Sequence, residues 1–313
     1  MLAKKLPIIV FLFVYVVLTG CRAQAASVAQ PEPVTKSEAA GVIVVSDISD
    51  EPSKEINRLL PLADILAANL TGYGIGVGDV KIAPDMETMI KWMKAGEVDL
   101  YMDSPYPAMM ISDGSGAEPL LRRWKSGVAE YKSVIFAFKE SGLTSLNDLN
   151  GQMVAFEEPF STSGYMMPLA LLVEAGLNPV KKESPEAAVA ADEVGYIFSG
   201  EDENSIQLIL GGKVPVAVLD NVTFGELPEE TRQQLVILAE SEMVPRQVVM
   251  VRPNMEPELK EAISQILMGL DDSEEGQVIL ETLKKTDRFD PFPGGPEAAF
   301  DRMRELYRLT RPE

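Results

Sequence analysis

Short apolar runs alternate with amphipathic segments along most of the chain, and this alternation limits the folds open to it. The run at 41–46 precedes residues 52–70, where apolar side chains recur at helical spacing. The same pattern predicts further strands at 77–82, 98–102, 133–138, 153–156, 216–219, 235–238 and 247–251. It predicts further helices at 84–95, 164–175, 205–210, 259–270 and 302–308. Strands that alternate with helices are typical of parallel sheets covered by helices, so we predict an α/β fold.

The N-terminus has the features of an export signal. Lys4 and Lys5 precede an apolar run at 6–18, which is shorter than the ~20 residues of a spanning helix. The sequence Leu18-Thr19-Gly20-Cys21 then matches a bacterial lipobox. We therefore predict a lipoprotein signal peptide at 1–20 and a lipid on Cys21. The alternative is a simple signal peptide that contains a cysteine, although Cys21 is the only one in the chain.

The remaining chain divides into a tether and a body. Residues 21–40 are rich in Ala, Gln, Pro and Ser and lack apolar periodicity, which predicts a flexible tether. Residues 41–313 form a stretch that is long for one core and sufficient for two lobes.

Charge and composition exclude several classes of function. The chain has 48 acidic and 28 basic residues and a net charge of -20. Removal of the signal peptide, with its two lysines, changes this to -22. Such a protein is a poor partner for nucleic acid, and solubility explains most of the acids.

The chain has no histidine, which excludes Cys/His zinc sites, histidine triads and the usual general base. We therefore expect no catalysis, no metal and no cofactor.

Three consecutive hydroxyl side chains precede a predicted helix. Ser161, Thr162, Ser163 and Gly164 lie between a strand that ends near Phe156 and the helix. Backbone N–H groups are unpaired at a helix N-terminus and the dipole is positive there, which predicts an oxyanion site. An ordinary helix cap, which needs only one hydroxyl, is the alternative.

A second candidate segment carries Ser104 and Tyr106. The segment 96–107 runs from a strand into a turn with this hydroxyl and this ring. Both candidate segments follow the carboxyl end of a strand, where open α/β sheets bind ligands. The alternative for Tyr106 is an aromatic ring packed under its loop.

In order and spacing, these motifs resemble the phosphate-, phosphite- and phosphonate-binding proteins of ABC importers, the PhnD-like solute-binding proteins. The resemblance extends from about residue 42 to the C-terminus. Its motifs are Gly96-x-Val-Asp99, Ser104-Pro105-Tyr106, Tyr131-x-Ser133, a Ser141–Gly151 segment and Ser161-Thr-Ser-Gly164.

The resemblance implies a type II periplasmic-binding-protein fold, with two α/β lobes joined by two hinge strands and a ligand cleft between them. One lobe would comprise 41–132 and 249–313 and the other 139–244, with hinges near 134–138 and 245–250. Carried over by motif, the Ser161–Ser163 turn would bind the oxyanion from one lobe. Ser104 and Tyr106 would contact it from the other. Asp220 matches a family acid that contacts a ligand's amino group.

The sequence departs from the family pattern where a histidine is common. The segment reads Phe198-Ser-Gly-Glu201-Asp202-Glu203, and Asp103 adds another acid beside Ser104. Acids that face the cleft would favour a monoanion, a protonated phosphonate or a ligand with an amine over a dianion. The alternative is that Glu201 to Glu203 only begin a helix, where acids are favourable.

These observations predict an exported, lipid-anchored binding protein that faces the periplasm or the exterior. It would capture a small oxyanion for an ABC permease. The alternative is a lipoprotein that senses the ligand and signals to a membrane partner such as a sensor kinase. An enzyme would need clustered acids in the cleft, for which Glu157, Glu158 and Asp220 are the candidates.

Overall fold

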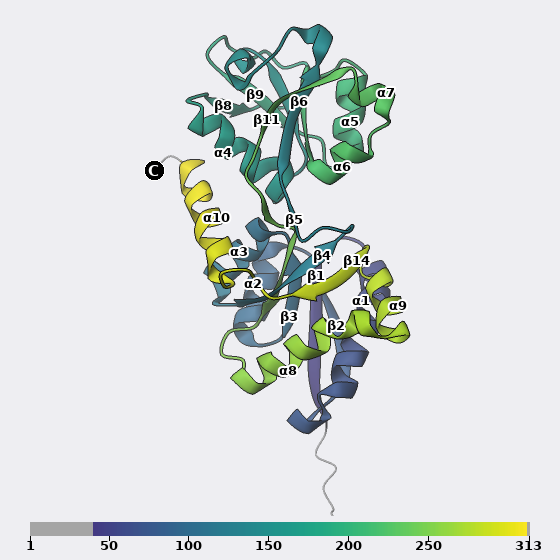
Figure 1. Ribbon diagram of the computed structural model, residues 1–313. Helices are drawn as coiled ribbons and strands as arrows, with labels where there is room; N and C mark the ends of the chain where they lie inside the picture. The colour runs from purple at the N-terminus through teal and green to yellow at the C-terminus, as the bar shows by residue number, and fades with distance from the viewer. Residues whose placement is uncertain (1–39, 312–313) are drawn as a thin grey trace, which may run out of the picture. The chain divides into compact units, whose positions relative to one another are not determined.

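A computed structural model describes residues 40–311, which contain two six-stranded sheets and the helices around them (Figure 1). The first sheet has the order β14-β4-β13-β3-β1-β2. Its strands are β1 (Gly41–Ile48), β2 (Ile75–Ala83), β3 (Leu100–Asp103), β4 (Glu118–Lys125), β13 (Gln247–Val251) and β14 (Thr286–Asp290). We call this sheet and the helices that pack on it lobe 1.

Helices cover both faces of the lobe 1 sheet. They are α1 (Pro52–Asn69), α2 (Met86–Ala95), α3 (Pro105–Ser115), α8 (Pro257–Met268), α9 (Glu274–Thr282) and α10 (Glu297–Leu309). Apolar side chains of α1, α8 and α9 form one core cluster, and those of α2, α3 and α10 form another. Local signals set the helix ends: Asp85 caps α2 by accepting a hydrogen bond from Thr88 N at 2.7 Å, and Gly96 ends it with φ 70°.

The second sheet has the order β11-β6-β10-β7-β9-β8 and defines lobe 2. Its strands are β6 (Ser133–Phe138), β7 (Met153–Phe156), β8 (Pro179–Lys181), β9 (Val194–Phe198), β10 (Val216–Asp220) and β11 (Leu235–Glu240). Its helices are α4 (Met167–Glu174), α5 (Asp202–Leu210), α6 (Asn221–Glu226) and α7 (Glu229–Arg232).

Strand direction determines which residues can meet at a sheet edge. In lobe 1, β1 is parallel to β2 and β3, and in lobe 2, β7, β8, β9 and β10 are parallel. β4 runs in the same direction as β3, because both pair antiparallel with β13. The carboxyl ends of β1, β3 and β4 therefore meet at one edge of the lobe 1 sheet, as those of β7, β9 and β10 do in lobe 2.

The chain passes between the sheets through two short paired strands. β5 (Glu130–Tyr131) pairs antiparallel with β12 (Val244–Pro245). The first hinge predicted at 134–138 is wrong, because those residues form β6 inside the lobe 2 sheet, between β11 and β10, and the crossing precedes them. The second predicted hinge, 245–250, overlaps the crossing only at its start, because residues 247–250 belong to β13 of the lobe 1 sheet.

Most strands and helices predicted from periodicity are present, with ends that differ by a few residues. The sequence analysis did not find α3, β4, β8, β9, α6, α7, α9, β14 or the short strands of the crossing between the sheets. Within residues 40–311, no helix is both long and apolar enough to cross a membrane. The predicted signal peptide and tether, including Cys21, lie outside the described residues.

Candidate functional site

A polar cavity of about 390 Å³ contains side chains from both lobes and from the crossing strands. Its lobe 1 wall comes from the ends of β1, β3 and β4, the helix α1 and the turn before β14. Its lobe 2 wall comes from the ends of β7 and β10 and from the start of α5. The charged residues of the wall are Asp47, Arg58, Asp103, Arg123, Lys125, Glu157, Glu158, Asp202, Asp220, Arg246 and Lys284. The site thus forms at the carboxyl ends of strands, as parallel sheets favour.

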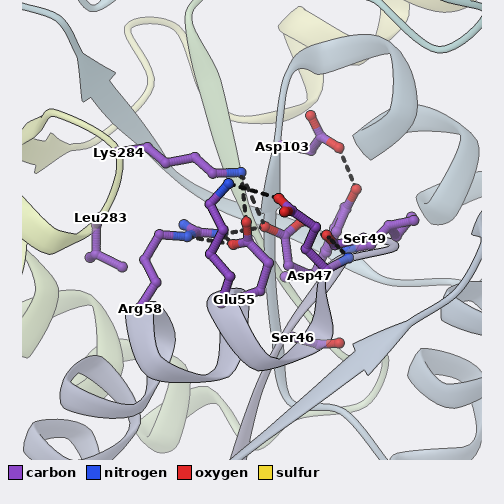
Figure 2. A network of polar contacts seen from close by, with 12 residues as sticks. Ser46, Asp47, Ser49, Glu55, Arg58, Asp103, Leu283 and Lys284 are labelled. Atoms are coloured by element: carbon purple, nitrogen blue, oxygen red, sulfur yellow. Dashed lines mark hydrogen bonds and ion pairs between the residues drawn. The ribbon is translucent and has the colours of Figure 1, made fainter.

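An ion-pair network joins three elements of lobe 1 beside the cavity (Figure 2). Arg58 of α1 pairs with Asp47 at the end of β1 at 2.5 Å and also with Glu55. Lys284, in the turn between α9 and β14, lies 3.5 Å from a Glu55 oxygen and 3.8 Å from an Asp47 oxygen. Lys284 and Lys285 both have left-handed backbone (φ 51° and 57°), a conformation that costs energy in residues other than glycine and often occurs at functional sites.

Arg123 and Lys125 project from β4 into the same cavity. The guanidinium of Arg123 is buried, with 3% of the residue exposed. It donates to Thr286 Oγ1 at 2.7 Å, to Gln247 Oε1 at 2.6 Å and to the carbonyl of Leu283. Burial lowers the pKa of Arg123 to about 10.

Lys125 is more isolated than Arg123. Its ammonium has no hydrogen-bond or ion-pair partner within residues 40–311. Burial, followed by the charges of Arg246 and Arg123, lowers its pKa to about 8.

Asp103 and Ser104 end β3 at the cavity. Asp103 accepts a hydrogen bond from the Tyr101 hydroxyl and another from Ser104 N at 2.6 Å. Burial nevertheless raises the pKa of Asp103 to about 6. This carboxylate is therefore held by neutral donors and lies next to the Ser104 hydroxyl.

The Ser161–Gly164 turn carries the hydroxyl side chains on the lobe 2 side of the cavity, as Ser104 does on the lobe 1 side. Ser161 caps a short π-helical turn (Thr162–Met166) that continues into α4, and its Oγ accepts from Gly164 N at 2.8 Å. Ser161 and Ser163 line the cavity, whereas Thr162 faces lobe 1. The Thr162 hydroxyl accepts from Tyr106 N at 2.9 Å and donates to Ser104 Oγ at 2.9 Å. One of the three hydroxyls thus connects the lobes directly.

Acids line the rest of the lobe 2 wall. Glu157 packs against Gly164 so closely that a Cβ there would lie 2.4 Å from Glu157 Cβ and 2.5 Å from Glu157 Oε2. Burial raises the pKa of Glu157. It also raises the pKa of Glu158 and of Asp202 to about 7, with a further increase from the charge of Glu157. Near neutral pH the carboxyls of Glu158 and Asp202 are therefore partly protonated.

Arg246 connects the crossing strands to lobe 2. Its guanidinium lies over the Tyr131 ring at 4.3 Å, and one nitrogen is 3.4 Å from an Asp220 oxygen. Asp220 Oδ1 also caps α6 by accepting from Val222 N at 2.7 Å and Thr223 N at 3.1 Å. Asp220 lines the cavity, but both of its oxygens already have partners in the chain.

The structure thus brings Ser104, Ser161, Ser163 and Asp220 to one cavity, and Thr162 and Gly164 shape its turn. Tyr106 does not fit its predicted role. It is only 3% exposed, belongs to the core under α3 and packs on Tyr307 with ring centroids 5.7 Å apart. Tyr106 belongs to the first turn of α3, and its ring lies on the side of that helix that faces the core.

The sequence analysis missed the cations of the cavity. They come from α1, β4, the second crossing and the turn before β14. Arg122 to Lys125 offered a weak signal, since basic residues at the carboxyl end of a strand are placed where ligands bind. The strand itself was not recognised. The cavity cations are Arg58, Arg123, Lys125, Arg246 and Lys284.

Comparison with known proteins gives consistent results. A family model described as "ABC transporter, phosphonate, periplasmic substrate-binding protein" matches residues 45–293. The phosphate-import protein PhnD of Mycolicibacterium smegmatis is 33% identical over 135 residues. That match covers 42% of this chain and 40% of the relative, so the chain aligns with less than half of the relative's length.

Solved structures share the fold. XAC2383 from Xanthomonas citri, with structures bound to chloride ion and to ATP, is 25% identical with a TM-score of 0.78, over 86% of this chain and 98% of that one. PhnD1 from Prochlorococcus marinus, in complex with methylphosphonate, is 17% identical with a TM-score of 0.60, over 85% and 97% of the two chains. The predicted type II periplasmic-binding-protein fold is therefore confirmed.

Proposed function

The chain belongs to the family of periplasmic substrate-binding proteins of phosphonate ABC transporters, and we propose that it captures a small oxyanion in its cleft and delivers it to an ABC importer. Members of this family are binding components and not enzymes, as the absence of histidine led us to expect.

One observation carries the proposal: hydroxyl donors from both lobes and desolvated cations from lobe 1 converge on a single cavity. Ser104 belongs to lobe 1, and Ser161 and Ser163 belong to lobe 2. Arg123 and Lys125 add two positive charges that no carboxylate of the cavity neutralises. Hydrogen bonds from such groups to an ionised acceptor are roughly twice as strong as neutral ones.

The relatives support a phosphorus oxyanion as the ligand class. The relative PhnD is a phosphate-import protein, PhnD1 has been solved with methylphosphonate, and XAC2383 has been solved with ATP. These ligands share a tetrahedral phosphorus group with charged oxygens. Such a group fits the serine hydroxyls of the cavity. Ser163 would be the donor from lobe 2, because Ser161 already caps the turn. Thr162 and Gly164 would support the site by holding the turn.

The acids of lobe 2 suit a ligand that also carries an amine. Glu157, Glu158 and Asp202 face the cavity and have no cationic partner within 4 Å in the described part of the chain. An ammonium group would lower their raised pKa values and supply that partner. Asp220 would act mainly by holding Arg246.

Lobe closure and membrane attachment complete the proposal. Closure around a cleft is the common way in which two-lobed binding proteins sequester a ligand, so the β5–β12 crossing would act as the hinge. A lipid on Cys21 would hold the exported protein at a membrane, where it meets its permease. Cys21→Ala should release the protein from the membrane fraction, and retention at the wild-type level would contradict the anchor.

Calorimetric titration with phosphate and methylphosphonate tests the binding site. Ser163→Ala should weaken binding about tenfold to a hundredfold, because a hydrogen bond to a charged group contributes roughly 1.5–3 kcal/mol. Ser141→Ala removes an exposed hydroxyl outside the cavity and serves as the matched control. Failure of the wild-type protein to bind any oxyanion would refute the proposed function.

A further inference from the structure

Two cations on one side of β4 face the cavity and lack an acidic partner. Arg123 and Lys125 are two residues apart, which places both side chains on the same face of the strand. Both line the cavity. Arg122, on the opposite face, instead pairs with both oxygens of Asp290, at 3.0 and 2.6 Å. Arg122 is therefore paired with a carboxylate, whereas the charges of Arg123 and Lys125 are directed at the cavity.

The other cavity cations are already paired with acids. Arg58 and Lys284 share Asp47 and Glu55, and Arg246 has Asp220. The three hydrogen bonds of Arg123 go to neutral acceptors and use three of its five donor hydrogens. Partly buried charges without a partner are unfavourable, and an anion in the cavity would supply one.

We propose that Arg123 and Lys125 form an anion subsite that makes the cleft selective for a dianionic oxyanion over a monoanion of the same shape. This inference rests on the proposed function and specifies its ligand. It replaces the expectation of a monoanion that the missing histidine and the added acids suggested. The two positive charges of the pair match the two negative charges of a fully ionised phosphonate.

The surrounding charges are compatible with this selectivity. Around Lys125, the cations Arg123, Arg246 and Lys284 disfavour its charged form and Asp103 favours it. A bound dianion would offset that repulsion. Across the cavity, Glu157, Glu158 and Asp202 have raised pKa values, so with a ligand that lacks an amine they can take up protons as the dianion enters. A protonated carboxyl is a hydrogen-bond donor to the ligand.

Methylphosphonate and methanesulfonate provide the test, because they have nearly the same shape and differ in charge when the phosphonate is fully ionised. The wild-type protein should bind methylphosphonate more tightly at a pH where the phosphonate has lost its second proton. Lys125→Met should weaken methylphosphonate binding about tenfold to a hundredfold, as expected for a lost bond between charged groups. It should weaken methanesulfonate binding much less. Lys125→Arg should restore the preference for the phosphonate.

Lys132→Met is the matched control, since Lys132 lies outside the cavity and pairs with Glu240 at 2.7 Å. It removes the same charge and should leave the ratio of the two affinities unchanged. Equal weakening of both ligands by Lys125→Met, or no weakening, would overturn the inference. Equal wild-type affinity for both ligands would also overturn it but would leave the proposed function intact. Only a wild-type protein that binds neither ligand would refute both.

Discussion

The two walls of the cavity are built in different ways. The lobe 2 wall comes largely from one continuous segment, 157–164, whose Ser161–Gly164 hydrogen bond spans three residues. The lobe 1 wall combines β1, α1, β4 and the turn before β14. There, Arg123 is held by Thr286 and Gln247, which are 163 and 124 residues away in the sequence. A site can therefore be local in one lobe and depend on distant contacts in the other.

The walls also differ in charge. Lobe 1 contributes four of the five cavity cations, and the fifth is Arg246 of the crossing. Lobe 2 contributes four acids and two serines. An oxyanion between them would meet cations on one side and hydroxyl groups or protonated carboxyls on the other. The comparison suggests that lobe 1 recognises ligand charge and lobe 2 recognises the tetrahedral oxygens.

The largest expected effect is on the stability of lobe 1. Arg123→Met should lower the free energy of unfolding by roughly 2–4 kcal/mol, because three acceptors around a buried side chain lose their donor. Chemical denaturation measures this change. Lys125→Met, in the same strand, should leave stability unchanged or raise it, since the ammonium is partly desolvated and unpaired. Equal destabilisation by both substitutions would show that Lys125 has a structural role.

These differences explain which parts of the site could be predicted from sequence. The turn at Ser161 was visible because its hydroxyls, glycine and following helix are adjacent in the chain. β4 was not recognised, because Arg122 and Arg123 are both buried although arginines usually indicate an exposed segment. Their partners come from β13, β14 and the turn before β14, and such pairings appear only in the folded structure.

The fold as a whole was easier to predict than the site. Apolar periodicity identified most of the parallel strands, though not β8 and β9, since strands buried on both faces appear as short apolar runs. Tyr106 was misplaced because a motif fixes a residue's position in the chain but not the direction of its side chain. That direction depends on how α3 packs against α10.

The lobe 2 turn should be sensitive to any added side-chain volume. Gly164→Ala would place a Cβ 2.4 Å from Glu157 Cβ and 2.9 Å from Ser161 Oγ, so the turn must shift. Overpacking of this kind costs roughly 1–3 kcal/mol. We expect a lower melting temperature together with weaker oxyanion binding. Gly225→Ala in α6 is the control, because its Cβ would meet no atom within 4 Å. Normal binding by the Gly164 variant would argue against the turn as part of the site.

Thr162 tests the direct connection between the two lobes. Its hydroxyl joins Ser104 Oγ and Tyr106 N, and its side chain is buried. Thr162→Val keeps the shape but should lower stability by about 1–2 kcal/mol, because Tyr106 N loses its acceptor. Thr162→Ser retains the hydroxyl and should restore most of that loss. A thermal melt without ligand measures both variants. A loss of affinity without a loss of stability would mean that the hydroxyl binds the ligand instead.

The last prediction is a dependence of stability on pH that arises from the acidic wall. Burial, with the charge of Glu157, raises the pKa of Glu158 and Asp202 to about 7 in the folded protein, against about 4 in an unfolded chain. Between these values the unfolded chain releases protons that the folded protein keeps. The stabilisation present at low pH is therefore lost as the pH rises from about 4 to about 7. Thermal melts across this range should show a falling melting temperature, and Asp202→Asn should reduce the slope.

Asp148→Asn is the control, because hydrogen bonds from Thr144 lower the pKa of that carboxyl and its titration lies below the range. A wild-type melting temperature that rises with pH would contradict the assignment of protonated acids to lobe 2.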